Sequence, residues 1–171
     1  MSEVPGMKCG FVAVIGAPNA GKSTLMNRLV GAKVSIVTHK VQTTRTRIMG
    51  IATRDKCQLV FIDTPGIFEP RRRLDRAMVD AAWRGAADSD KVMLVVDAKR
   101  GIDGDTQRIV DGLRRTKRTA LLALNKIDLL PRDQLLALAS QLNDTGVFEE
   151  TFMISALKGD GCDDVMDRLT D

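Results

Sequence analysis

The sequence contains no tyrosine, and aromatic residues make up only 4% of its 171 positions. A core with so few aromatic rings must be filled mainly by Leu, Val, Ile and Met, and the 44% hydrophobic content allows this. A chain of this length can bury most of its apolar surface in one domain. We therefore expect residues 1–171 to form a single domain.

Long apolar segments are also missing. No stretch approaches the roughly 18 apolar residues that a membrane-spanning helix needs. Residues 1–10 lack the apolar stretch of a signal peptide. The sequence therefore predicts a cytoplasmic protein.

Cysteine and histidine, the residues of disulfide frameworks and many metal sites, are scarce. Cys9, Cys57 and Cys162 are widely spaced and have no CxxC pattern or neighbouring histidine, which disfavours both a disulfide framework and a metal site. We expect all three to be reduced, small packing residues. The single histidine, His39, is expected to be an exposed bystander and not a general base.

The net charge of +4 is unevenly placed, because basic residues far outnumber acidic ones through residue 60. A basic N-terminal third could favour a polyanion such as RNA. The alternative is a region that handles phosphate groups and carries solvated lysines, and we favour this second interpretation.

Apolar periodicity predicts strands and helices in alternation. Strands are expected over 10–16, 48–52, 58–63, 91–97, 119–124 and 151–154, and helices over 22–30, 75–87, 106–115, 132–142 and 162–169. The second and third strands read as a hairpin, and the polar segment 32–46 as a mobile loop. This order predicts a three-layer α/β fold, with a mainly parallel six-stranded sheet, one antiparallel edge strand and helices on both faces.

The first loop of this fold carries a phosphate-binding motif. Residues 16–23 match GxxxxGK[ST] between a predicted strand and a predicted helix, which is typical of the P-loop NTPase fold. Backbone N–H groups can surround a β-phosphate, Lys22 can reach the β- and γ-phosphates, and Ser23 can coordinate Mg²⁺. The predicted nucleotide contacts here are Gly16, Ala17, Pro18, Asn19, Ala20, Gly21, Lys22, Ser23 and Thr24.

A second motif, Asp63-Thr64-Pro65-Gly66, follows another apolar strand. Asp63 is expected to hold Mg²⁺ through water. The Gly66 N–H can bond a γ-phosphate oxygen and release it after hydrolysis, which would couple the downstream segment to the nucleotide. Arg71–Arg73 in that segment are interpreted as a solvated face, with an arginine finger as the alternative.

The segment Asn125-Lys126-Ile127-Asp128 indicates which nucleotide base is bound. A carboxylate accepts two hydrogen bonds, which matches guanine N1–H and its exocyclic amine, whereas adenine offers no such donor pair. Asp128 should therefore select guanine, the Lys126 stem can cover the base plane, and Asn125 can tie the loop to its neighbours.

A weaker signal follows the last predicted strand, at Ser155, Ala156 and Leu157. Backbone N–H groups there could meet the guanine oxygen, because one further loop at this edge of the sheet would close over the base. The predicted ligands are thus GTP or GDP with Mg²⁺.

With these motifs in this order, residues 8–171 resemble the Era family of translation-factor-like GTPases, and Gln42-Thr43-Thr44-Arg45 narrows the match. The tRNA-modifying and the double-domain ribosome assembly GTPases share the other motifs and remain alternatives. The resemblance implies a GTP-hydrolysing switch in which Lys22, Thr44 and Gly66 act in catalysis. Thr44 would close on Mg²⁺, with Thr43 as the alternative.

Two residues affect the rate of GTP hydrolysis that the resemblance implies. Ile67 stands where Ras-like GTPases carry the glutamine that orients water, which implies slow intrinsic hydrolysis. Asn19 occupies the position at which related enzymes coordinate K⁺ near the β- and γ-phosphates. The alternative is that Asn19 only stabilises the turn.

Era proteins continue into a KH-type RNA-binding domain, and residues 1–171 show no match to its GXXG loop. The resemblance implies a role in small ribosomal subunit assembly, with 16S rRNA bound mostly through the KH domain missing from this chain. It further implies a monomer that associates peripherally with the inner membrane.

Two other functions remain open. An ATP-using small-molecule kinase shares the glycine loop, but the Asn125–Asp128 segment argues against it. A GTP-binding interaction module with little turnover is kept open by Ile67. Nucleotide competition would distinguish the ATP-using kinase from a GTPase. Single-turnover hydrolysis would distinguish the GTP-binding module from a GTPase.

Overall fold

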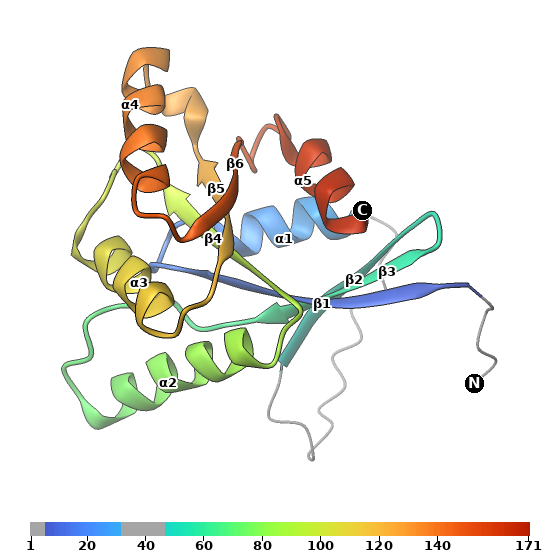
Figure 1. Ribbon diagram of the computed structural model, residues 1–171, viewed down its shortest axis with the longest axis horizontal. Helices are drawn as coiled ribbons and strands as arrows, with labels where there is room; N and C mark the ends of the chain where they lie inside the picture. The colour runs from blue at the N-terminus through green and yellow to red at the C-terminus, as the bar shows by residue number, and fades with distance from the viewer. Residues whose placement is uncertain (1–5, 32–46) are drawn as a thin grey trace.

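A computed structural model of the chain describes residues 6–31 and 47–171 (Figure 1). Its strands are β1 (Lys8–Gly16), β2 (Arg47–Arg54), β3 (Cys57–Asp63), β4 (Lys91–Asp97), β5 (Ala120–Asn125) and β6 (Phe148–Met153). Its helices are α1 (Lys22–Val30), α2 (Arg73–Ala87), α3 (Gly104–Arg115), α4 (Arg132–Asn143) and α5 (Cys162–Thr170), with a short 3-10 helix η1 (Ile127–Leu129).

The strands of the described residues form a six-stranded sheet in the order β2-β3-β1-β4-β5-β6. Neighbouring strands from β3 to β6 pair in parallel. β2 pairs antiparallel with β3 at the edge, through a tight turn in which Asp55 has a φ of 53°. The predicted fold class is therefore confirmed.

Helices cover both faces because side chains alternate along buried strands. In β4, Leu94 and Val96 point into a core formed with α2, α3 and α4. Met93 and Val95 point into a second core, formed with α1 and α5 on the opposite face (Figure 1). A strand buried on both faces reads as a continuous apolar run, which is why the sequence located β4 well.

The single tryptophan of the sequence lies against the core beneath α2 and α3. Trp83 of α2 is partly buried and packs on this core. A side chain at Gly112 of α3 would collide with the Trp83 ring. The glycine thus allows the two helices to approach, with Trp83 of α2 packed against α3.

The predicted and observed elements differ at their ends. β6 covers residues 148–153, whereas the sequence predicted 151–154, and η1 was not predicted. β6 lies at the edge of the sheet in the described part of the chain. Its polar residues Glu149 and Glu150 are consistent with an exposed edge strand. The loop expected over 32–46, with His39, lies outside the described residues.

The cysteines are free, as expected, but they are not all packing residues. Cys162 is buried in the core under α5, and this burial raises the pKa of its thiol. Cys9 is exposed, so that expectation was wrong. The reason is that β4 pairs with β1 only from Val12 onward, and the start of β1 extends beyond it.

None of the helices within residues 6–31 and 47–171 has the length and apolar character that crossing a membrane requires.

Candidate nucleotide-binding site

The predicted site residues come together at the carboxyl edge of the sheet. The strands β1, β3, β4, β5 and β6 are parallel, so the loops that follow them all lie at one edge. Ligands of open α/β sheets bind at this edge.

The loop between β1 and α1 has the turn that a phosphate site needs. Asn19 and Gly21 adopt left-handed backbone conformations, with φ of 63° and 99°. Gly21 directly precedes α1, and a side chain there would collide with the Asn125 amide. Asparagine tolerates this conformation better than most residues. The turn therefore gives Asn19 a structural role, whether or not it also binds a cation.

Lys22 lies over this loop. Its Nζ donates hydrogen bonds to the carbonyl oxygens of Ala17, at 2.9 Å, and Gly16, at 3.3 Å. Ser23 and Thr24 follow in the exposed first turn of α1. An ammonium and a helix N-terminus thus point to the same loop, an arrangement that favours an anion.

The segment after β3 is fastened to the phosphate loop. The buried Thr64 hydroxyl donates to the Val14 carbonyl at 2.5 Å, and the Ile67 N–H donates to the Gly16 carbonyl at 2.8 Å. A Cβ on Gly66 would lie 3.0 Å from Pro18 Cγ and 3.1 Å from Pro18 N, so glycine permits this approach. The segment after β3 therefore lies directly against the end of β1 and the start of the phosphate loop.

Ile67 itself turns away from the loop. Its side chain is 2% exposed and belongs to the core beneath α2 and α3. The predicted Mg²⁺ ligand Thr44 and the side chain of Asp63 lie outside the described part of the chain. The backbone of Asp63 is described, and it pairs with Val14 at the end of β3.

Asn125 joins the loop after β5 to two neighbouring loops. Its side chain is buried, with Nδ2 donating to the Ala20 carbonyl and Oδ1 accepting from the Ala156 N–H, both at 3.0 Å. Both Nδ2 and Oδ1 of this amide are therefore bonded to the backbone of another loop. Asn125 therefore fixes the distance between the phosphate loop and the loop after β6.

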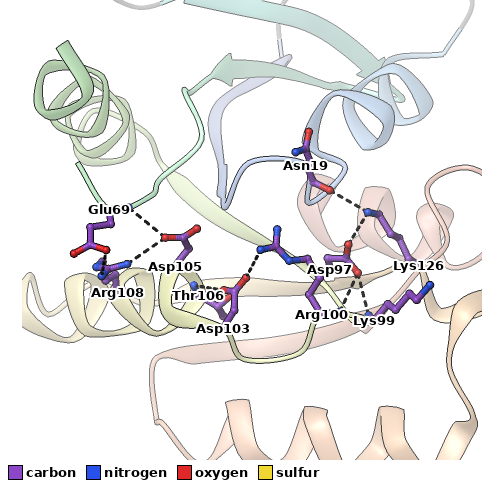
Figure 2. Close-up of polar contacts among 10 residues, drawn as sticks. All are labelled: Asn19, Glu69, Asp97, Lys99, Arg100, Asp103, Asp105, Thr106, Arg108 and Lys126. Atoms are coloured by element: carbon purple, nitrogen blue, oxygen red, sulfur yellow. Dashed lines mark hydrogen bonds and ion pairs between the residues drawn. The ribbon is translucent and has the colours of Figure 1, made fainter. Parts of the chain in front are cut away.

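Lys126 adds a parallel link. Its Nζ donates to the Asn19 carbonyl at 3.0 Å and lies 2.6 Å from Asp97 Oδ2 (Figure 2). The two consecutive residues Asn125 and Lys126 thus bind two consecutive carbonyls of the phosphate loop.

Asp128 lies in η1 and is exposed. Partial desolvation acts to raise its pKa, but the Ser155 hydrogen bond and the charge of Lys158, 3.6 Å away, outweigh it and hold the pKa below the usual aspartate value. The carboxylate therefore stays ionised at neutral pH. Ionised, it can accept two N–H donors, as recognition of guanine requires.

The loop after β6 closes on itself. The Ser155 N–H donates to the Asp160 carbonyl at 3.0 Å, and the Gly159 N–H to the Ser155 carbonyl at 2.7 Å. Ser155 and Ala156 are buried, whereas Leu157 is 75% exposed. The start of the loop is thus buried, and Leu157, directly after it, lies at the surface.

Helix α1 holds the same loop from the other side. Arg28 donates from Nε to the Ala156 carbonyl at 3.2 Å and from Nη2 to the Leu157 carbonyl at 2.5 Å. A hollow of about 360 Å³ lies here, lined by Thr24, Asn27, Arg28, Gly31, Ala156 and Leu157. The predicted contacts Thr24, Ala156 and Leu157 therefore share one open space.

The sequence analysis missed Asp97 and Arg28. Asp97 had a usable signal, because it ends β4 at the same edge at which Asn125 ends β5, and the two residues are register partners. Arg28 lies among ordinary helical positions of α1 and carried no such signal.

Comparison with known proteins agrees with this geometry. Residues 11–126 match a protein family described as 50S ribosome-binding GTPase. GTPase Era of Rhizobium meliloti (strain 1021) is 62% identical over 164 residues, covering 96% of this chain and 52% of that protein. GTPase Era of Mesorhizobium japonicum is 58% identical over 168 residues, covering 98% of this chain and 54% of the relative.

Solved structures of Era proteins are also similar to this chain. Era in complex with MgGDPNP and nucleotides 1506–1542 of 16S ribosomal RNA matches with a TM-score of 0.81 and 35% identity, over 96% of this chain and 56% of that one. Aquifex aeolicus Era bound to GDP and aluminium fluoride matches over the same shares, with a TM-score of 0.79 and 35% identity.

The chain spans about half the length of the Era proteins that it matches. The family match covers more than half of the chain, from the strand before the phosphate loop to Lys126. The chain therefore belongs to the 50S ribosome-binding GTPase family, and Era proteins are similar to it over almost its whole length.

Proposed function

We propose that the chain binds GTP and GDP with Mg²⁺ at the carboxyl edge of the sheet and hydrolyses GTP slowly, as a molecular switch. The observation that carries this proposal is the pair of bonds from Asn125 and Lys126 to the phosphate loop. They hold a base-selecting carboxylate and a phosphate cradle at a fixed separation, as a ligand with a base at one end and phosphates at the other requires.

The residues present suit a hard cation beside the phosphates. Ser23 supplies an exposed hydroxyl at the start of α1. By the family resemblance, Asp63 and Thr44, whose side chains lie outside the described part of the chain, would add oxygen donors, the ligand type that Mg²⁺ prefers. When bound, Mg²⁺ neutralises charge on the phosphate oxygens. Lys22 and the Gly66 N–H would hold the γ-phosphate from the protein side.

Slow hydrolysis follows from the residue after Gly66. The Ile67 side chain is apolar and buried, so it can neither reach nor orient an attacking water. A positioned water and an extra positive charge account for much of the rate in related phosphoryl transfer. We therefore propose that K⁺, held by Asn19, or a partner supplies the missing charge.

Single-turnover hydrolysis of Mg-GTP in KCl and in NaCl, at matched ionic strength, tests this proposal. We expect hydrolysis to be faster in K⁺ by about tenfold, which corresponds to about 1.4 kcal/mol of barrier. ATP should not be cleaved. Equal rates in the two salts would contradict the K⁺ site, and cleavage of ATP at the GTP rate would contradict guanine selection.

The matched variant for this experiment is Asn19→Gly. Glycine accepts the left-handed conformation of Asn19 and removes only the side-chain amide. We expect Asn19→Gly to keep its GDP affinity and to lose the acceleration by K⁺. Retained acceleration in the variant would exclude Asn19 as the cation ligand and leave it the role in the turn.

We also propose a role in small ribosomal subunit assembly, in the cytoplasm or peripherally at the inner membrane, with the chain as a monomer. The support is its similarity to an Era protein solved with a 16S ribosomal RNA segment. RNA would be bound mostly by the KH domain, which lies in the half of Era that this chain does not span. Filter binding should therefore show weaker binding of that RNA to this chain than to a full-length Era, and equal affinity would contradict it.

A further inference from the structure

Asp97, at the end of β4, is held in one orientation by the turn that follows it. Its Oδ1 accepts hydrogen bonds from the backbone N–H groups of Lys99, at 3.0 Å, and Arg100, at 3.3 Å. Its side chain is only 11% exposed. The other oxygen, Oδ2, is thereby directed at the Lys126 ammonium 2.6 Å away, as Figure 2 shows.

Lys126 passes this constraint to the phosphate loop, because the same ammonium donates to the Asn19 carbonyl. Lys126 and Asn19 are both non-glycine residues in left-handed conformations, with φ of 67° and 63°. Such conformations persist only where the surroundings hold them. The ammonium thus lies between two turns that contain left-handed residues, one in each nucleotide-binding loop.

A negative charge is needed for the ammonium to stay there. Two cationic residues, Lys99 and Arg100, directly follow Asp97 in the chain. Arg100 is paired with Asp103 at 3.1 Å. Without the Asp97 carboxylate, the ammonium would lose its ion pair and, among residues 6–31 and 47–171, keep the neutral Asn19 carbonyl as its acceptor.

We propose that Asp97 is a positioning residue for guanine-nucleotide binding, acting through Lys126. It fixes the Lys126 ammonium on the Asn19 carbonyl, and so holds the phosphate loop in its turn and the Lys126 stem beside the base. This inference rests on the proposed function of the site. It assigns to the loop after β4 a part in nucleotide binding, although that loop carries none of the recognised motifs.

A double-mutant cycle on this chain tests the proposal, with GDP affinity and dissociation rate measured by a fluorescent GDP analogue. Asp97→Asn should weaken GDP binding by about tenfold, mostly through faster dissociation, because a charge-assisted contact is lost. In the Lys126→Met background, Asp97→Asn should have no further effect. Full additivity of the two losses would overturn the proposal.

The control is Asp103→Asn, which removes the charge that pairs with Arg100 in the same loop. Asp103 also caps α3 by accepting from the Thr106 N–H, and asparagine can keep that cap. We expect wild-type GDP affinity in this variant. A loss as large as that of Asp97→Asn would mean that the loop's charge or stability is responsible and would overturn the specific role of Asp97.

Asp97→Glu covers the case in which Asp97→Asn does not fold. It keeps the charge but displaces it, so we expect weaker GDP binding that again disappears in the Lys126→Met background. Persistence of the loss in that background would contradict the proposal. The wild-type chain is measured first, because failure of the wild type to bind GDP would overturn the proposed function and not this inference alone.

Discussion

Replacing Lys22 by alanine is expected to abolish measurable binding of Mg-GTP and Mg-GDP. The ammonium lies over the phosphate loop, on the Gly16 and Ala17 carbonyls, where phosphate oxygens would be its strongest acceptors. Losing several charge-assisted bonds should lower the affinity by about a thousandfold, or about 4 kcal/mol. Equilibrium titration with a fluorescent GDP analogue measures this loss.

The control for Lys22 is Lys91→Ala. Lys91 begins β4 at the opposite, amino end of the sheet and forms a partly exposed ion pair with Glu149 at 2.8 Å. Exposed pairs of this kind contribute about 0–1 kcal/mol to stability, so both fold and GDP affinity should be retained. GDP affinity of the Lys22→Ala variant within a few-fold of the wild type would show that the phosphates bind elsewhere.

The strands of this fold could be predicted where burial is two-sided. β4 is apolar throughout its centre and was located to the residue, and Gly31, with a φ of 69°, ends α1 as expected. β6 was misplaced because its exposed glutamates resemble a loop until the pairing with β5 is known. Edge strands depend on a tertiary neighbour, and a local pattern does not contain that neighbour.

The motifs of the candidate site could be predicted from the sequence, but the hydrogen bonds that connect their loops could not. The motifs meet because parallel strands end at one edge. The bonds that join them, such as Lys126 to Asn19, link residues far apart in the chain. Arg28 and Asp97 contact backbone or side-chain groups of other loops, and only the folded chain brings these together.

The burial of Ile67 illustrates the same limit. From sequence, a hydrophobic residue after Gly66 shows only that no amide is available to orient water. The structure adds that the side chain is part of the core beneath α2 and α3 and that its N–H is bonded to Gly16. Substituting glutamine at this position would therefore place an amide in the core and not beside the phosphate.

Asp128→Asn is expected to change the base preference from guanine to xanthine. In the proposed site the carboxylate would accept from two N–H groups of guanine, whereas an amide offers one acceptor and one donor. Xanthine carries a carbonyl where guanine carries its amine, so it suits the amide. Loss of charge-assisted bonds should weaken GDP binding by about a hundredfold or more, and binding of xanthosine diphosphate should improve.

Competition of GDP, xanthosine diphosphate and ADP against a fluorescent GDP analogue measures this change, with Asp133→Asn as the matched control. Asp133 lies in the exposed first turn of α4, just after the base loop, so the same loss of charge there should leave the preference for guanine intact. The lowered pKa of Asp128 keeps its carboxylate ionised throughout the neutral range, so the preference of the wild-type chain for GDP over ADP should not depend on pH there. An unchanged preference for GDP in Asp128→Asn would place the base outside the loop after β5, and the bonds from Asn125 and Lys126 would then serve only to hold the fold together.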